Sequence, residues 1–194
     1  MANVQEKMAL LIIDAQKGFM DSVFDVENAV NVIESLVGAA RNASIPIIYT
    51  QEMHRKERVD FGRELDGSED IHCLEGTDDV DLIDSLSPQD GEYVIKKRRY
   101  SCFFATDLEI LLKGLGVNTL IVCGFLTDVC VHYTCVDAHQ HDYHVKVVYD
   151  GVRGSTVDAH HAALQAIKYL QRNSEIHSDQ WISSLQNQTL LRNK

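Results

Sequence analysis

The fold is decided by one stretch, NTLIVCGFLTDVCVHYTCVDAHQHDYHVKVVYDG, residues 118–151. It holds an apolar run, a glycine, a Thr-Asp pair, a segment with Val129, Tyr133 and Val136 at helical spacing, and a second apolar run. This order predicts a strand, a helix and another strand. Apolar runs without alternation are typical of strands that are buried on both faces of a parallel sheet.

The rest of the chain repeats this order. Strands are expected at 8–13, 47–50, 93–97, 118–125 and 144–151, and helices at 25–44, 106–116, 127–143 and 158–173, the last of which is expected to close the chain. The alternation predicts an α/β fold, a three-layer α/β/α sandwich with a mostly parallel sheet. The length of 194 residues fits a single domain, 1–194. A long polar connection, from Gln51 to about Asp90, is expected to shape a site.

Composition narrows the class of partner. The net charge of −11 repels phosphate backbones and anionic membranes, so we expect a small-molecule substrate, no nucleic acid and no membrane. The five cysteines are an odd number without a C-x-x-C pair, which argues against a disulfide framework or a zinc ribbon. The N-terminal apolar run is short and lacks a basic segment before it, so a cytoplasmic protein with reduced thiols is expected.

Three reactive side chains follow strands. Asp14 ends the first predicted strand, Lys97 ends the third, and Cys130 lies just beyond the fourth, at the start of a helix. Ligands of open parallel sheets bind outside the carboxyl ends of the strands. A helix N-terminus and a lysine are expected to lower the pKa of a thiol, and a carboxylate can take its proton. Each residue alone also has an ordinary structural interpretation, so the shared position carries the prediction of an activated nucleophile.

Three segments, LLIIDAQKGF, KKRRYSCFFATDLEILL and GFLTDVCV, carry the pattern of a known family. They resemble, in the same order, the aspartate, lysine and nucleophile motifs of the isochorismatase-like cysteine hydrolases, and the resemblance runs from about residue 8 to residue 170. It implies a Rossmann-like fold and a catalytic triad of Asp14, Lys97 and Cys130. True isochorismatases of the family lack the nucleophilic cysteine, so Cys130 argues against that activity.

The resemblance also implies a reaction. Cys130 would attack a carbonyl to form a thioester, Asp14 would relay the thiol proton to the leaving amine, and Lys97 would stabilise the thiolate. In the family a cis peptide precedes the helix, and here it would join Phe125 and Leu126. The backbone N–H groups of Leu126 and Cys130 would then form an oxyanion hole.

Further residues are expected to contact the substrate: Gln16, Phe19, Arg63, Tyr100 and Phe125. For Phe19, a position in the hydrophobic core is an equally good interpretation of the sequence. Arg63 belongs to an arginine-rich loop; it would suit an anionic or ureido substrate, unless this charge run is only a solvated surface.

A metal site is the remaining question. Nicotinamidases of the family bind a divalent metal through a D-x-H motif and a later histidine, and Glu52, His54 and His72 occupy similar places here. These ligands would suit zinc, iron or manganese. Because Glu52 replaces the aspartate and Met53 the usual tryptophan, the preferred interpretation is that the histidines buttress the pocket through hydrogen bonds and that no cofactor is required.

The sequence therefore predicts a cysteine-dependent amidohydrolase that cleaves a C–N bond in a small amide, carbamoyl or ureido compound. The alternatives are a nicotinamidase with metal-assisted deamidation and a catalytically silent α/β module that binds metabolites. A homo-oligomer is expected because family members commonly form dimers or tetramers.

Overall fold

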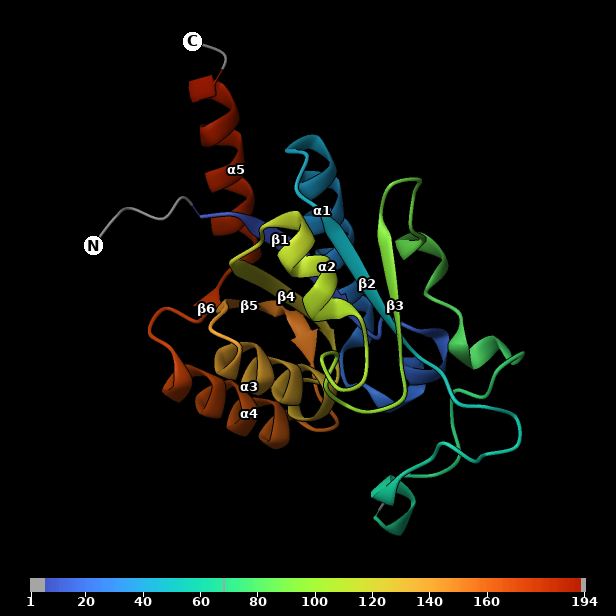
Figure 1. The fold of residues 1–194 in the computed structure, drawn as a ribbon. Coiled ribbons are helices and arrows are strands. Elements are labelled where there is room, and N and C mark those ends of the chain that lie inside the picture. Colours follow the sequence, from blue (N-terminus) through green and yellow to red (C-terminus); the bar gives the residue numbers. More distant parts are fainter. Residues whose placement is uncertain (1–5, 68, 193–194) are drawn as a thin grey trace.

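The computed structural model describes residues 6–67 and 69–192, in which six parallel strands form one sheet. Residues 1–5, 68 and 193–194, which the predicted domain 1–194 includes, lie outside the described residues. The strands are β1 (Met8–Ile13), β2 (Ile47–Glu52), β3 (Tyr93–Lys97), β4 (Thr119–Phe125), β5 (His144–Arg153) and β6 (Glu175–Ile176). The helices are α1 (Val26–Asn42), α2 (Leu108–Leu115), α3 (His132–Gln140), α4 (Val157–Leu170) and α5 (Ser178–Arg192). The predicted parallel sheet is confirmed (Figure 1).

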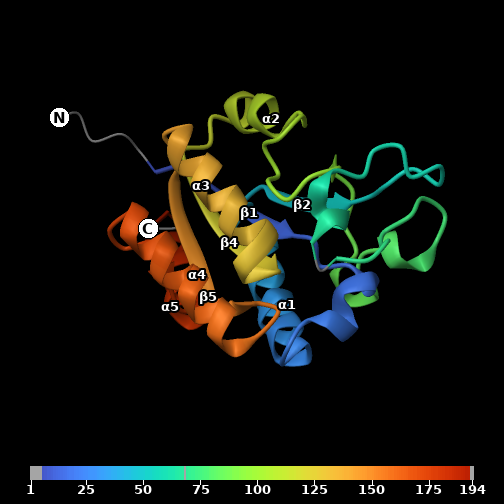
Figure 2. The same cartoon turned by 90° about the horizontal axis from the view of Figure 1, so that it is seen from below.

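Helices cover both faces of the sheet (Figures 1 and 2). Successive side chains of β1 point to opposite faces. Ala9, Leu11 and Ile13 enter the core that α2, α3 and α4 complete, whereas Leu10 and Ile12 enter the core that α1 and α5 complete. All five are fully buried, so both faces of the central strand need an apolar residue at every position. The three-layer α/β/α sandwich is therefore confirmed.

The end of the chain differs from the prediction. The helix after the fifth strand does not close the chain, because β6 adds a sixth strand and α5 follows it. In α5, Trp181 and Leu185 are buried against the layer that holds α1. The other residues of the helix are mostly polar, and its apolar residues, which include Ile182, do not form a continuous stripe, so its sequence gives little helical signal.

The strand order β3-β2-β1-β4-β5-β6 reverses its direction between β1 and β4. A ligand-binding crevice is expected at the carboxyl ends of two strands that diverge in this way. Gly124, near the end of β4, has φ +112°, and a Cβ there would lie 2.0 Å from the carbonyl oxygen of Ile13. Only glycine permits this close approach. It holds the end of β4 against the end of β1, where Asp14 begins the next segment.

The connection between β2 and β3, coloured teal to green, projects from the sheet (Figure 2). It contains short turns of 3-10 helix and is partly anchored by an isolated pairing of His54 with Leu74. Among the described residues, no helix has the length and apolarity needed to cross a bilayer.

Candidate active site

Asp14, Lys97 and Cys130 meet at the carboxyl ends of the strands, as the sequence predicts. The Lys97 Nζ lies 2.6 Å from Asp14 Oδ2 and 3.4 Å from Cys130 Sγ. Asp14 follows β1, Lys97 ends β3, and Cys130 lies in a turn of π-helix, Thr127–Val131, between β4 and α3. All three are buried, and Cys130 is 4% exposed. An ammonium group thus bridges a carboxylate and a thiol.

Two polar residues hold this arrangement. The Thr50 hydroxyl donates to Asp14 Oδ1 at 2.7 Å and accepts from the Asp14 backbone N–H at 3.1 Å. Asp14 has φ +47°, and this double contact fixes the residue in a left-handed conformation. Gln16 donates to the Glu52 carbonyl at 2.9 Å and accepts from the Glu52 N–H at 2.7 Å. The predicted substrate contact of Gln16 is therefore replaced by a structural role, because both ends of its amide bind backbone.

A second buried carboxylate joins the group. Glu52 Oε2 lies 2.9 Å from Lys97 Nζ and 3.7 Å from Cys130 Sγ. Its other oxygen, Oε1, faces the Nε2 atoms of His54 at 3.3 Å and His72 at 3.5 Å. Lys97 is consequently shared between two carboxylates instead of being dedicated to Asp14.

The two carboxylates have opposite pKa shifts. Burial raises the pKa of Asp14 above its usual value, although Lys97 acts against this shift. Burial acts in the same direction on Glu52, but Lys97 and hydrogen bonds from His54 and His72 hold its pKa well below the usual value. Although burial opposes it, the surrounding anionic groups keep the pKa of Lys97 well above its usual value. Asp14 is thus suited to exchanging a proton, and Glu52 to remaining ionised.

The predicted lowering of the Cys130 pKa is wrong. Burial raises the pKa of its thiol well above the usual value, and the Asp14 and Glu52 carboxylates act in the same direction, against Lys97. The Asp14 and Glu52 carboxylates lie close to the sulfur, and a thiolate would add a further negative charge beside them in a site shielded from water. Burial therefore favours the thiol over the thiolate at Cys130.

A cavity of about 450 Å³ opens above Cys130. Phe19, Tyr100 and Leu126 line it, as predicted for residues near a substrate, and so do Glu52 and His72. Further lining residues that the sequence analysis did not select are Gly18, Ser22, Glu69, Asp70, Asp128, Val129 and Ser155. Asp128 and Val129 lie inside the nucleophile motif and Gly18 inside the aspartate motif, which was the available signal for these three. The others belong to connections whose course the sequence does not determine.

Two predicted substrate residues lie elsewhere. The Phe125 side chain is fully buried in the core beneath α1 and α5. Phe125 ends β4, and its side chain alternates away from the cavity. The Arg63 side chain is 95% exposed and pairs with Asp66 at 2.7 Å, so it does not line the cavity.

The turn that carries Cys130 follows a cis peptide between Phe125 and Leu126, as the resemblance implies. The Leu126 carbonyl accepts from the N–H groups of Val129 and Val131, both at 3.1 Å. The Thr127 hydroxyl lies 2.9 Å from His160 Nδ1, which ties this turn to α4. The backbone at Leu126 and Cys130 is therefore fixed at the wall of the cavity.

Glu52, His54 and His72 could hold a metal ion, since one ligand atom from each lies within 4.8 Å of the others. The Nδ1 of His72 lies 2.7 Å from the Asp70 carbonyl, a contact of the kind that orients the Nε2 atom of a metal-binding histidine. The Nδ1 of His54 is buried without a hydrogen-bond partner, and Asp60 Oδ1 lies 3.6 Å from it. The donor set therefore fits a divalent metal. The same contacts also provide the predicted buttressing, with both imidazoles directed at Glu52.

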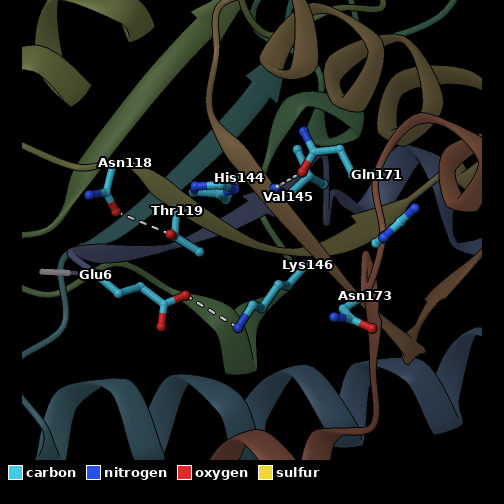
Figure 3. Close-up of a pocket in the computed structure, with 9 residues that line it drawn as sticks. Glu6, Asn118, Thr119, His144, Val145, Lys146, Gln171 and Asn173 are labelled. Atoms are coloured by element: carbon cyan, nitrogen blue, oxygen red, sulfur yellow. Dashed lines mark hydrogen bonds and ion pairs between the residues drawn. The ribbon is translucent and has the colours of Figure 1, made fainter. Parts of the chain in front are cut away.

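A separate cavity of about 300 Å³ lies at the opposite end of the sheet (Figure 3). It is lined by Thr119 and His144, the first residues of β4 and β5, and by an ion pair of Glu6 with Lys146 at 3.2 Å. None of the three predicted catalytic residues lines it. Of these two cavities, the one over Cys130 joins a reactive group to a binding space.

Comparison with known proteins finds similarity over most of the chain. Residues 8–178 match the Isochorismatase domain family. A ureidoacrylate amidohydrolase of Yersinia enterocolitica is 32% identical over 189 residues, which cover 82% of this chain and 81% of the relative. A cysteine hydrolase from Pseudomonas syringae has a solved structure that matches with a TM-score of 0.85 at 28% identity, over 93% of each chain.

A third similar protein has a structure that was solved with a bound metal. The pyrazinamidase of Pyrococcus horikoshii, whose structure was solved in complex with zinc, matches with a TM-score of 0.79 at 25% identity. The match covers 88% of this chain and 99% of that protein. The family match over most of the chain, together with the shared fold, decides the classification: this chain belongs to the isochorismatase domain family.

Proposed function

We propose that the protein is a cysteine-dependent hydrolase that cleaves a C–N bond in a small amide, carbamoyl or ureido compound through a thioester. One observation carries the proposal: the Lys97 ammonium contacts both Asp14 and Cys130 at the floor of a cavity large enough for a small metabolite. The named activity of the ureidoacrylate amidohydrolase relative supports the bond class.

In the proposed reaction, Cys130 Sγ attacks the substrate carbonyl carbon while its proton passes to the Asp14 carboxylate. The tetrahedral intermediate collapses as Asp14 gives this proton to the departing nitrogen, so the C–N bond breaks and a thioester remains. Water then attacks the thioester, the acid leaves, and the sulfur regains a proton. Backbone N–H groups of Leu126 and Cys130 are the proposed donors to the oxyanion, and each such donor contributes roughly 3 to 4 kcal/mol of transition-state stabilisation in other hydrolases.

The pKa directions support this order of steps. Because burial raises the pKa of both Cys130 and Asp14, the proton need not leave the thiol before the substrate arrives. Substrate binding brings a carbonyl to the sulfur and removes the remaining water. Attack and proton transfer can then occur together, with Lys97 stabilising the negative charge on either partner.

The test is ammonia release from nicotinamide, pyrazinamide, biuret and several N-carbamoyl and ureido acids. Cys130→Ala should abolish release, whereas Cys135→Ala, a change in the same buried core, should keep most of it. Release by the Cys130→Ala variant would refute the nucleophile. A folded wild-type protein without release from any compound would favour the silent metabolite-binding module.

A second candidate function, metal-assisted nicotinamide deamidation, is favoured by the group of Glu52, His54 and His72. A divalent metal held there would supply a Lewis acid beside the cavity, able to bind a ring nitrogen. Elemental analysis of protein purified without chelator tests this. Stoichiometric metal that is lost in His54→Ala but kept in His161→Ala, an exposed histidine of α4, would support it. Metal-free wild-type protein that still releases ammonia from nicotinamide would oppose it.

A further inference from the structure

Three acidic residues line the cavity above Cys130: Glu69, Asp70 and Asp128. Asp128 accepts from the Ser155 N–H at 2.9 Å and from the Ser155 hydroxyl at 2.6 Å, and Glu69 accepts from the Tyr100 hydroxyl. These donors are neutral, so they orient the carboxylates without cancelling their charge. Carboxyl groups are ordinarily ionised at neutral pH, so these acidic residues give the wall an anionic character.

The floor of the cavity does not compensate for these charges. Lys97 is already shared by Asp14 and Glu52 at 2.6 and 2.9 Å. His72, the other cationic candidate, faces Glu52 at 3.5 Å and reaches Glu69 only at 4.0 Å. Even when Lys97 and His72 are both charged, they balance Asp14 and Glu52, and the three wall carboxylates remain in excess.

The arginines of the neighbouring loop do not supply the missing positive charge. Among the described residues that line the cavity there is no lysine and no arginine. Arg55 and Arg98 both pair with Asp60, at 3.0 and 2.9 Å, and Arg63 pairs with Asp66. The expectation of an arginine for an anionic substrate is therefore replaced by an acidic wall.

Aromatic surface completes the wall. Phe19 and Tyr100 both line the cavity, and aromatic faces next to carboxylates favour an ammonium group. We propose that this cavity selects amide or ureido substrates whose group away from the scissile bond is cationic or uncharged, and disfavours substrates that carry a carboxylate there. The proposal rests on the proposed hydrolase function. It gives this chain a substrate preference different from that of the relative named for ureidoacrylate, because acrylate carries a carboxylate.

The expected discrimination is large enough to measure. A substrate carboxylate about 6 Å from one wall carboxylate, at an effective dielectric constant of about 20, is disfavoured by roughly a hundredfold. Salt and solvent at the cavity mouth reduce this effect, so we expect a preference of at least about tenfold.

The first test measures charge selectivity without turnover. Cys130 is modified with two methanethiosulfonates, one bearing a trimethylammonium-ethyl group and the other a sulfonato-ethyl group, and each rate is divided by the rate with 2-mercaptoethanol. The normalised rate should favour the cationic reagent by at least about tenfold. Glu69→Gln combined with Asp70→Asn should reduce this ratio several-fold, while Glu57→Gln, outside the cavity in the same connection, should not. A normalised ratio near one, or one that favours the anion, would overturn the proposal.

The second test uses turnover of three ureas that share one reacting end: 2-aminoethylurea, 2-methoxyethylurea and 3-ureidopropanoate. The cationic and neutral compounds should exceed the anion in kcat/KM by at least about tenfold. A preference for 3-ureidopropanoate would refute the charge selection while keeping the hydrolase. No turnover of any urea or panel amide, together with a cationic preference in the labelling test, would instead count against the hydrolase function alone.

Discussion

Replacing Lys97 with methionine should remove the ammonium group that the buried carboxylates of Asp14 and Glu52 share. Lys97 Nζ lies 2.6 Å from Asp14 and 2.9 Å from Glu52, and its side chain is fully buried. Methionine has a similar volume, so the change removes mainly the charge. Removing one partner of a buried ion pair costs roughly 3 to 5 kcal/mol of unfolding free energy, and we expect about 4 kcal/mol near pH 8.

The unfolding free energies of the wild-type protein and of Lys97→Met should depend on pH with opposite signs. In the folded wild-type protein the pKa of Glu52 is lower than in the unfolded chain. Ionised Glu52 therefore stabilises the fold at pH values above its unfolded-state pKa, and this contribution is lost as the pH falls through its folded-state pKa. Without Lys97, burial raises the pKa of Asp14 further, and at Glu52 it is opposed by the hydrogen bonds from His54 and His72 but no longer by an ammonium group, so the stability of the variant is instead lost as the pH rises. Between its unfolded-state and folded-state pKa values, each carboxyl group changes the unfolding free energy of the variant by up to about 1.4 kcal/mol per pH unit. The loss of unfolding free energy caused by Lys97→Met should therefore fall below about 2 kcal/mol near pH 5.

Urea unfolding followed by the fluorescence of Trp181, the single tryptophan and a buried residue, provides the measurement. Lys96→Met is the matched control, because Lys96 precedes Lys97 in β3 but is exposed, and its loss should cost less than about 0.5 kcal/mol at either pH. Equal costs of Lys97→Met near pH 5 and pH 8 would refute the reasoning. Ammonia release by Lys97→Met should also be lost at both pH values.

Three further outcomes follow from the same contacts. Thr50→Val removes the hydroxyl that donates to Asp14 and should cost about 1 to 3 kcal/mol of unfolding free energy, with a fall in kcat; an unchanged kcat would mean that Asp14 is positioned without it. Gly124→Ala should prevent stable folding, as judged by circular dichroism, because the added Cβ would collide with the backbone of Ile13. Gly38→Ala, inside α1 where the added Cβ meets open space, should instead raise the unfolding free energy by about 0.5 to 1 kcal/mol. Alkylation of Cys130 by iodoacetamide should be slow at pH 7 and rise about tenfold per pH unit up to pH 9, since its pKa is raised; a rate that levels off below pH 8 would contradict the raised value.

The sequence was sufficient for the parts of the site that strand ends determine. Asp14, Lys97 and Cys130 each follow an apolar run, and parallel strands bring their carboxyl ends to one edge, so their meeting was predictable. The apolar runs also predicted the layers, because a strand covered on both faces needs apolar residues at consecutive positions. Both β6 and α5 escaped this logic, because a strand of 2 residues and a helix without a continuous apolar stripe do not make a pattern.

Loop geometry could not be predicted in the same way. Arg63 and Glu69 lie in the same connection between β2 and β3, yet Arg63 points to solvent and Glu69 lines the cavity. No periodicity distinguishes the two positions, because the course of an irregular segment depends on tertiary contacts. The sequence therefore indicated the chemistry better than the substrate.

The sharing of Lys97 is the feature that separates the roles of the two carboxylates. If Lys97 served Asp14 alone, the pair would hold that carboxyl firmly ionised, and its proton affinity would be too low to accept a proton from a buried thiol. Glu52 draws part of the same ammonium charge and is further held by two imidazoles. Glu52 therefore remains the permanent anion, and Asp14 retains a raised pKa at the position nearest the proton it must move. Glu52→Gln should accordingly lower the pKa of Asp14, and the acidic limb of the pH–rate profile should move to lower pH; an unmoved limb would show that Glu52 acts only on the histidines.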